Sequence, residues 1–285
     1  MSTVAPSTVA RLQRMNRGSH FRAYGLHGEE ATALIDPFLA VDHAWISAPT
    51  FPPHPHAGFS AVSYLFLDSE TGIDNRDSLG NRNRILPGGL HWTAAGRGVV
   101  HEEVPAETGK TAHMLQIFIN LAREQQSAPP FALSQAPQDV PVVQLPGAKV
   151  RVPLGAYGGA RSPLTPPTEV SLLDISLDGG AELIVPVAAG HNAFVMPIYG
   201  TLTVDGQRFD GNEPKLPLFP AQAQSRAITL KAGQSGTKAV LFAGPPLRQP
   251  VHWQGSVAMA SVETLAAAIA AYQRGEFGTL SGEPS

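Results

Sequence analysis

The sequence predicts an all-β protein built from two consecutive β units, and three observations support this prediction. Short runs rich in strand-forming residues recur along most of the 285 residues. The chain contains 28 glycines and 26 prolines, which favour many short strands and turns over long helices. The runs do not alternate with helical segments, so a parallel βαβ sheet is not indicated. A chain of this length can form two domains of medium size.

Residues 1–18 are expected to form a flexible N-terminal tail. This stretch is rich in Ser, Thr and Ala and becomes basic at Arg11, Arg14 and Arg17. A solvated tail is favoured over binding to an anionic partner. The first β unit is then assigned to residues 19–130. Its expected strands are residues 20–26, 33–41, 59–67, 90–94, 98–104 and 114–121.

The second β unit is assigned to residues 131–285. A Pro/Ala/Gln-rich stretch at residues 125–139 lacks periodicity and is expected to link the units. One helix is predicted at the end of the chain, where Ser261 can cap it and Gly275 can end it. Its apolar stripe is expected to pack on the second unit, in preference to binding a partner protein. The strands expected before it are residues 149–152, 169–177, 181–187, 192–198, 201–204, 227–230 and 238–242.

Two pairs of polar residues indicate a metal site in the first unit. His54 and His56 are one residue apart, and His101 and Glu103 repeat this spacing. Residues i and i+2 of a strand point to the same face, so neighbouring strands would bring all four side chains together. Three imidazole nitrogens and a carboxylate suit a divalent transition metal.

The coordination number of such a site stays open. Four ligands can close a tetrahedral zinc site, or they can leave two positions open on an octahedral ion, which would make a reaction centre. Glu103 would then be a ligand only, or a ligand and also a general base toward a bound substrate hydroxyl.

Other histidines are weaker candidates. His91 follows the turn at Pro87-Gly88 but has no ligand partner two residues away, so packing or support of the ligands is favoured. His113 is assigned a similar role, and His191 cannot form a metal site alone. No constellation surrounds the remaining candidates, which are His20, His27, His43 and His252.

Composition narrows the range of partners. The net charge of −3 and the pI near 6.4 provide no general attraction to nucleic acid or to an anionic membrane. The chain has no cysteine, which rules out disulfides and thiolate ligands. The sequence shows neither an apolar run long enough to span a bilayer nor an apolar signal-peptide core in residues 1–17. A cytoplasmic location is therefore expected.

Taken together, these motifs resemble the pirin family of bicupins. The resemblance extends over nearly the whole chain after residue 18. The matching stretches are Asp36-Pro37-Phe38-Leu39, Phe51-Pro52-Pro53-His54-Pro55-His56, Arg76-Asp77-Ser78-Leu79-Gly80-Asn81, Gly96-Arg97-Gly98, His101 with Glu103, Tyr157-Gly158-Gly159, Gly190-His191-Asn192, and Trp253 with Gly255.

The resemblance implies two tandem cupin (jelly-roll-like) β-barrels, with metal only in the first. The ligands of the family map onto His54, His56, His101 and Glu103. The family usually holds iron, so Fe(II) is the expected ion, and Mn, Ni, Co, Cu and Zn are alternatives that this ligand set accepts.

Two functions follow from the resemblance. Some members resemble quercetin 2,3-dioxygenases, which implies a flavonol-like or other enolic aromatic substrate and O₂. Phe51 matches an aromatic position of the pocket and is the expected substrate contact. Other members are metal-dependent, redox-responsive regulators that bind a protein partner.

The chain also departs from the family pattern around the pocket. The departures are Ala57 for a common Arg, Ser60 for Glu, Asn75 for His and His91 for Gln.

Overall fold

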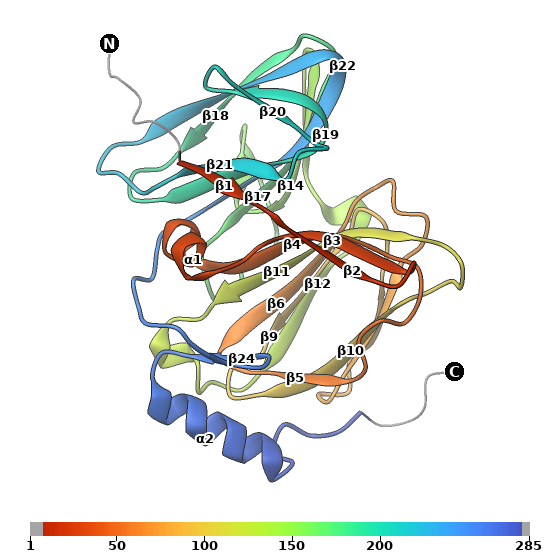
Figure 1. Ribbon diagram of the computed structural model, residues 1–285, viewed down its shortest axis with the longest axis vertical. Helices are drawn as coiled ribbons and strands as arrows, with labels where there is room; N and C mark the ends of the chain where they lie inside the picture. Colours follow the sequence, from red (N-terminus) through yellow and green to blue (C-terminus); the bar gives the residue numbers. More distant parts are fainter. Residues whose placement is uncertain (1–7, 281–285) are drawn as a thin grey trace.

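The computed structural model describes residues 8–280 and confirms the predicted pair of β-barrels (Figure 1). Two sheets form the first barrel. The larger sheet has seven strands in the order β12 (Phe131–Gln135), β9 (Leu90–Ala94), β6 (Phe59–Leu65), β11 (Ala112–Asn120), β4 (Phe38–Ile46), β3 (Phe21–Leu26) and β2 (Gln13–Arg17). The smaller sheet has the order β5 (His54–His56), β10 (Val99–Pro105), β7 (Ile73–Asp77) and β8 (Arg82–Ile85).

The second barrel is one nine-stranded sheet that curls around its own core. Its main path runs β1 (Thr8–Arg11), β21 (Lys215–Phe219), β19 (Asn192–Val204), β22 (Arg226–Gly244), β17 (Ser171–Leu177), β14 (Ala148–Leu154) and β13 (Val142–Leu145). β18 (Glu182–Val187) pairs with β22, and β20 (Gln207–Asp210) pairs with β19. Aliphatic side chains fill this barrel, among them Val150, Ile175, Val185 and Leu241.

Short elements complete the fold. Two small hairpins are β15 (Ala156–Tyr157) with β16 (Ala160–Arg161), and β23 (His252–Gln254) with β24 (Val257–Met259). The helices are α1 (Glu29–Ile35), α2 (Val262–Gln273) and two single 3₁₀ turns, Arg123–Gln125 and Pro137–Asp139. Within residues 8–280, none of the helices has the length and apolar character needed to cross a bilayer.

The strand expected at residues 33–41 is wrong in its first part, because residues 33–35 belong to α1. Gly28 adopts a positive φ of 109°, which turns the chain into the helix. The Thr32 hydroxyl donates a hydrogen bond to the Gly28 carbonyl and stabilises this first turn. Tertiary contacts then place Ile35 in the core, where it is fully buried.

The flexible tail expected at residues 1–18 is also wrong over its described part. Residues 8–11 form β1, which pairs with β21 of the second barrel, and residues 13–17 form β2, which pairs with β3 of the first. Sheet edges present unpaired backbone groups that an extended segment can satisfy, and the polar side chains do not prevent this. Residues 1–7 of the expected tail lie outside the described residues.

The C-terminal helix packs on the first barrel, not on the second as expected. Figure 1 shows the chain leaving β22 and returning along the first barrel to α2. Leu265 and Ala268 of the helix are buried in one cluster with Ala57 and Val100 of the first barrel. An apolar stripe predicts that a helix is covered, but it does not indicate by which surface.

The first barrel therefore includes segments that were expected to belong to the second unit, residues 131–285. Strand β12 lies beyond residue 130 and pairs with β9. The Ala258 amide donates to the Ala57 carbonyl at 3.1 Å and joins β24 to the end of β5. Gly58 permits this contact, because a Cβ on Gly58 would collide with the Ala258 carbonyl.

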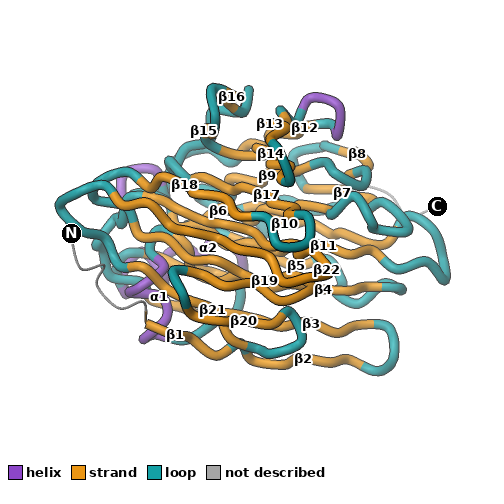
Figure 2. Tube along the Cα trace, turned by 90° about the horizontal axis from the view of Figure 1, so that it is seen from above, coloured by secondary structure: helices purple, strands orange, loops and turns teal. Residues whose placement is uncertain are grey.

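The large sheets of the two barrels pack face to face and share one apolar core. Figure 2 shows their strands running in similar directions in the two layers. Phe38 of the first barrel meets Phe194 and Phe242 of the second edge-on, with ring centroids 5.3 and 5.6 Å apart. Burial of these rings is favourable in proportion to the apolar area removed from water. The interface between the barrels is therefore part of the hydrophobic core.

A buried ion pair between Lys238 and Asp174 lies at the interface between the two barrels. The Asp174 side chain is fully buried, and Lys238 Nζ lies 2.5 Å from its Oδ1. From the other barrel, the Tyr64 hydroxyl donates to Asp174 Oδ2 at 2.7 Å. Burial and the neighbouring carboxylate raise the pKa of Tyr64, so its hydroxyl stays a donor.

Replacing Lys238 by Met should destabilise the protein strongly, because the buried Asp174 carboxylate would lose the ammonium group that lies against its Oδ1. Loss of one partner of a buried pair typically costs about 3–5 kcal/mol. The Lys110→Met variant is the matched control, since Lys110 and Glu107 form an exposed pair at 2.6 Å. Exposed pairs contribute about 1 kcal/mol or less. Urea denaturation of both variants measures the difference, and equal midpoints would contradict the prediction.

Candidate metal centre

The two predicted ligand pairs lie on adjacent antiparallel strands. In the register of β5 and β10, His54 lies opposite His101 and His56 lies opposite Val99. Strands β5 and β10 are thus neighbours, as predicted. Because His54 and His56 are two residues apart in an extended strand, both imidazoles point toward His101.

The three imidazoles converge through their Nε2 atoms. His101 Nε2 lies 2.9 Å from His56 Nε2 and 3.2 Å from His54 Nε2. The ring centroids of each pair are 4.7 Å apart. Among residues 8–280, His54, His56 and His101 are the group of side chains that can hold a metal ion, with ligand atoms within 4.8 Å of one another.

Hydrogen bonds on the far side of two rings determine where their protons lie. His54 Nδ1 donates to the Pro52 carbonyl at 2.9 Å, and His56 Nδ1 donates to the Ser256 carbonyl at 3.2 Å. In the neutral rings both Nε2 atoms are therefore lone-pair acceptors. His101 Nε2 can donate a proton to only one of them, so one contact would join two lone pairs. A cation among the three nitrogens removes this repulsion, and the donor set fits a divalent metal.

The protonation states also suit metal binding. Burial lowers the pKa of His56 to about 3, and it lowers the pKa of His101 well below its ordinary value. The pKa of His54 is lowered by burial too, against the opposing effects of the Pro52 carbonyl and Glu102. All three rings are thus neutral at pH 7, which is the form that binds metal.

Glu103, the fourth predicted ligand, lies on the wall of the same cavity. It does not belong to the tight group of three histidines. Its Oε2 accepts a hydrogen bond of 2.7 Å from the Ser63 hydroxyl. Burial raises the pKa of Glu103 to about 7, and the Ser63 hydrogen bond opposes this effect. A carboxyl with such a pKa can gain or lose a proton at neutral pH.

The cavity in front of the histidines has a volume of about 620 Å³. Phe51, the predicted substrate contact, lies in its wall with its ring centroid 6.5 Å from that of His54. The other apolar side chains of the wall are Met15, Phe21, Ala44, Ile46, Ile73, Met114 and Phe118. A cavity that combines apolar side chains with several polar groups is typical of a site for a small organic molecule.

Two serines that hold the site were not predicted. Ser63 on β6 contacts Glu103, and Ser256 supplies the carbonyl that orients His56. Ser63 lies 40 residues from Glu103, and Ser256 lies 200 residues from His56. Local sequence patterns contain no signal for contacts at such separations.

His91 lies outside the metal cavity, in a buried polar cluster. Its Nδ1 lies 2.8 Å from Ser134 Oγ, and its Nε2 lies 3.2 Å from both Thr93 Oγ1 and Asn75 Nδ2. Asn75 and His91, which both depart from the family pattern, thus contact each other. Burial lowers the pKa of His91 to about 4, so the ring is neutral at pH 7.

The remaining histidines lie away from the three-histidine group. His43 Nε2 and His113 Nε2 form a buried pair at 2.7 Å, and His113 Nδ1 contacts Asp68 at 2.9 Å. His113 thus has a structural role, and His43, which the sequence presents as incidental, is its partner. His191 Nδ1 contacts the Ala189 carbonyl at 3.1 Å.

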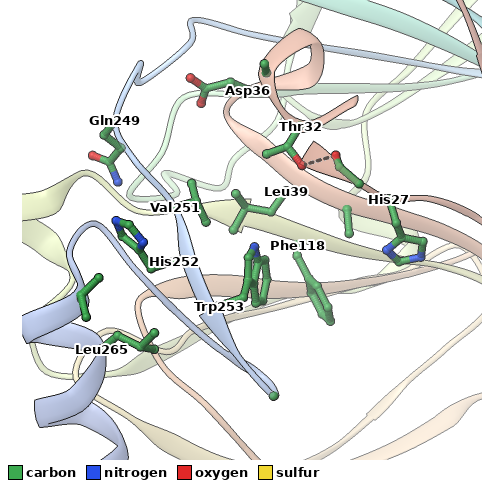
Figure 3. Close-up of a pocket in the computed structure, with 15 residues that line it drawn as sticks. His27, Thr32, Asp36, Leu39, Phe118, Gln249, Val251, His252, Trp253 and Leu265 are labelled. Carbon is green, nitrogen blue, oxygen red and sulfur yellow. Dashed lines mark hydrogen bonds between the residues drawn. The ribbon is translucent and has the colours of Figure 1, made fainter. Parts of the chain in front are cut away.

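A second cavity of about 900 Å³ lies on the other side of Phe118 (Figure 3). Phe118 lines both cavities, and His27 and His252 line the second. Figure 3 draws Trp253 and Phe118 among the residues that line this cavity. None of His54, His56 and His101 lines this cavity, so it is not the space in front of the candidate metal ligands.

Protonation of the buried His91 ring should lower the free energy of unfolding at acidic pH. Its folded pKa of about 4 lies below the ordinary value of 6.5, so the fold favours the neutral ring. This stability is complete above pH 6.5 and is lost as the pH falls from 6.5 toward 4. At pH 4.5 the loss would be roughly 2–3 kcal/mol.

The His91→Gln variant tests this, because Gln can form hydrogen bonds without titrating. Urea denaturation at pH 7.5 and at pH 4.5 should show a smaller loss of stability for His91→Gln than for the natural protein. The control is His191→Gln, which should keep the natural pH dependence. A His91→Gln variant with that same dependence would show the prediction to be wrong.

Comparisons with known proteins agree with the fold. The pirin family model matches residues 19–119, and the model of the pirin C-terminal cupin domain matches residues 172–278. Pirin of Rattus norvegicus is 30% identical over 279 residues, which cover 96% of this chain and 93% of the rat protein. Pirin-like protein 2 of Arabidopsis thaliana is 30% identical over 281 residues, covering 96% and 85% of the two chains.

Solved structures show the same architecture. A quercetin 2,3-dioxygenase from Acinetobacter baumannii superposes with a TM-score of 0.86 at 25% identity, covering 98% of this chain and 99% of the other. A bacterial pirin from Escherichia coli, solved in complex with nickel(II), has a TM-score of 0.65 at 18% identity, covering 84% and 100%. The two family models, the full-length relatives and the paired barrels together show that this chain belongs to the pirin family.

Proposed function

We propose that this protein is a metal-dependent oxygenase that acts on a flavonol-like or other enolic aromatic substrate. One observation carries the proposal: three neutral imidazole nitrogens converge in the wall of a cavity of about 620 Å³. The cavity is large enough for a small aromatic molecule, and the converging nitrogens give it a reactive end. The relative named as a quercetin 2,3-dioxygenase supports this choice of reaction.

In this proposal His54, His56, His101 and Glu103 hold the metal in the first barrel. The aliphatic filling of the second barrel supports a single site. Fe(II) is the proposed ion, and Mn, Ni, Co, Cu and Zn fit the same donors. When bound, the ion supplies Lewis acidity toward the enolic hydroxyl and redox chemistry toward O₂.

The residues of the chain then have separate roles. Glu103 accepts the proton of the substrate hydroxyl, because its carboxyl lies on the wall of the cavity that also holds the three histidines. Ser63 orients the Glu103 carboxyl through its 2.7 Å hydrogen bond. Phe51 and the apolar wall bind the aromatic rings of the substrate and exclude water from the reacting end.

The alternative function is a metal-binding regulator without enzymatic activity. The pirins among the relatives favour this alternative, in which a change of the metal's redox state alters a surface presented to a protein partner. The cytoplasmic location stays a prediction. Binding of metal without turnover of any substrate would favour the regulator.

The protein as purified without a His-tag should contain close to one equivalent of a transition metal. The His101→Ala variant should lose most of it, since His101 Nε2 lies 2.9 Å from His56 Nε2 and 3.2 Å from His54 Nε2 and would be one of the ligands. His191→Ala is the control and should keep the metal. Elemental analysis measures the content, and less than about a tenth of an equivalent in the natural protein would overturn the metal site.

Iron-loaded protein should consume quercetin when air is admitted to an anaerobic mixture. The flavonol absorbance should fall and carbon monoxide should be released. The Glu103→Gln variant should turn over at least about 100-fold more slowly, because a general base contributes 10²–10⁴-fold to the rate. The His91→Gln variant should keep its activity. Full metal content without loss of flavonol, with each of the candidate ions, would contradict the oxygenase.

A further inference from the structure

We infer that strand β2 forms one wall of the substrate site and that Arg17 binds an anionic group of the substrate. The substrate class would then be a hydroxylated aromatic acid, with its hydroxyl at the histidines and its carboxylate or sulfonate at Arg17. This inference rests on the proposed function, since it names the kind of molecule that the metal cavity accepts.

Strand β2 is placed at the cavity by its pairing with β3. In this register Arg17 lies opposite Phe21 and Met15 lies opposite Ala23. Directly opposite residues of an antiparallel pair share one face of the sheet. Phe21 lines the cavity, and Met15 and Arg17 on the same face line it too.

Aromatic contacts place the Arg17 guanidinium near the histidines. Its Cζ lies 4.7 Å from the centroid of the Phe51 ring, in a cation–π contact. Phe51 in turn meets Phe21 edge-on at 5.3 Å and lies 6.5 Å from the His54 ring. A single aromatic ring therefore separates the guanidinium from a candidate metal ligand. A substrate with two fused rings can reach from one to the other.

The charges of the cavity wall favour an anion at Arg17. The two cationic side chains of the wall are Arg14 and Arg17, and neither forms an ion pair within residues 8–280. The two acidic side chains of the wall already have partners: Asp42 contacts His27 at 2.6 Å, and Glu103 accepts from Ser63.

The shape of the guanidinium points to a particular anion. It presents donors in a planar fork that matches the oxygens of a carboxylate or sulfonate, and the contact with Phe51 keeps it beside the cavity. The cation–π contact uses the face of Phe51, and the guanidinium of the exposed Arg17 can still donate hydrogen bonds to an anion. An anionic group on the substrate would accept these hydrogen bonds.

The second barrel holds this wall in position. Strand β1, just before β2, pairs with β21, and the Leu12 amide donates to the Pro214 carbonyl at 2.8 Å. The cationic wall is thus tied to the second barrel on one side and to β3 on the other. Such anchoring lowers the conformational entropy that substrate binding would otherwise cost.

Binding of two fluorescent probes tests the inference without any turnover. The probes are 6-hydroxy-2-naphthoate, which carries a hydroxyl and a carboxylate at opposite ends, and the neutral 2-naphthol. Each is titrated into the metal-free protein and into protein loaded with redox-inert Zn²⁺. The natural protein should bind the acid more tightly than 2-naphthol, and added salt should reduce this difference.

The Arg17→Gln variant should weaken binding of the acid by roughly 10- to 100-fold, because hydrogen bonds to charged groups are the stronger ones. Its affinity for 2-naphthol should stay unchanged, which shows that Phe51 is still in place. Arg17→Lys should give an intermediate loss, since it keeps the charge without the planar fork. Arg11→Gln, on β1 and outside the cavity wall, is the matched control and should bind both probes normally.

Two outcomes would overturn the role of Arg17. Equal losses for both probes in Arg17→Gln would indicate a structural role only, and equal affinity for the acid in Arg17→Gln and in the natural protein would indicate no role. The proposed function fails in a different way: a protein that never consumes quercetin can still show the charge-dependent difference between the probes in its metal-free form.

Discussion

The candidate metal centre of the first barrel depends on one constraint, the approach of three imidazole nitrogens to a single point. His54 and His56 are held by carbonyl groups on the far side of each ring, so their Nε2 lone pairs must face His101. Such an arrangement is unfavourable without a cation and favourable with one. One of the two carbonyls belongs to Ser256, which lies beyond the second barrel in sequence. The return of the C-terminal segment to the first barrel is therefore part of the site.

Sequence alone predicted the features that depend on local periodicity. The alternation of a strand places His54 and His56 on one face, and it does the same for His101 and Glu103. Strand formers and turn residues likewise predicted two β units, and the resemblance to pirins, which named them as cupin barrels, is confirmed. These features require only short-range stereochemistry and a family pattern.

The features that depend on distant contacts were not predictable in this way. The basic segment around Arg14 was interpreted as a solvated tail. No nearby sequence pattern indicates that β3 and β21 have edges to which this segment can pair. The stripe of α2 predicts burial but not the surface that buries it. Ser63 reaches Glu103 only because β6 and β10 lie on facing sheets of one barrel. Each of these incorrect or missing predictions concerns the distant segment that an element contacts, and none concerns the local conformation of the element itself.

The second barrel has a structural reason to be present although aliphatic side chains fill its interior. It anchors β1, and so it positions the strand that carries Arg17 along the metal cavity. In sequence it lies between the first barrel and the segment that carries Ser256, and that segment returns to the first barrel and contacts His56. The shared core around Phe38 and the Tyr64–Asp174 hydrogen bond hold the barrels in one relative position. A rigid joint of this kind keeps the two returning segments in register with the histidines, which is the precision that a binding site requires.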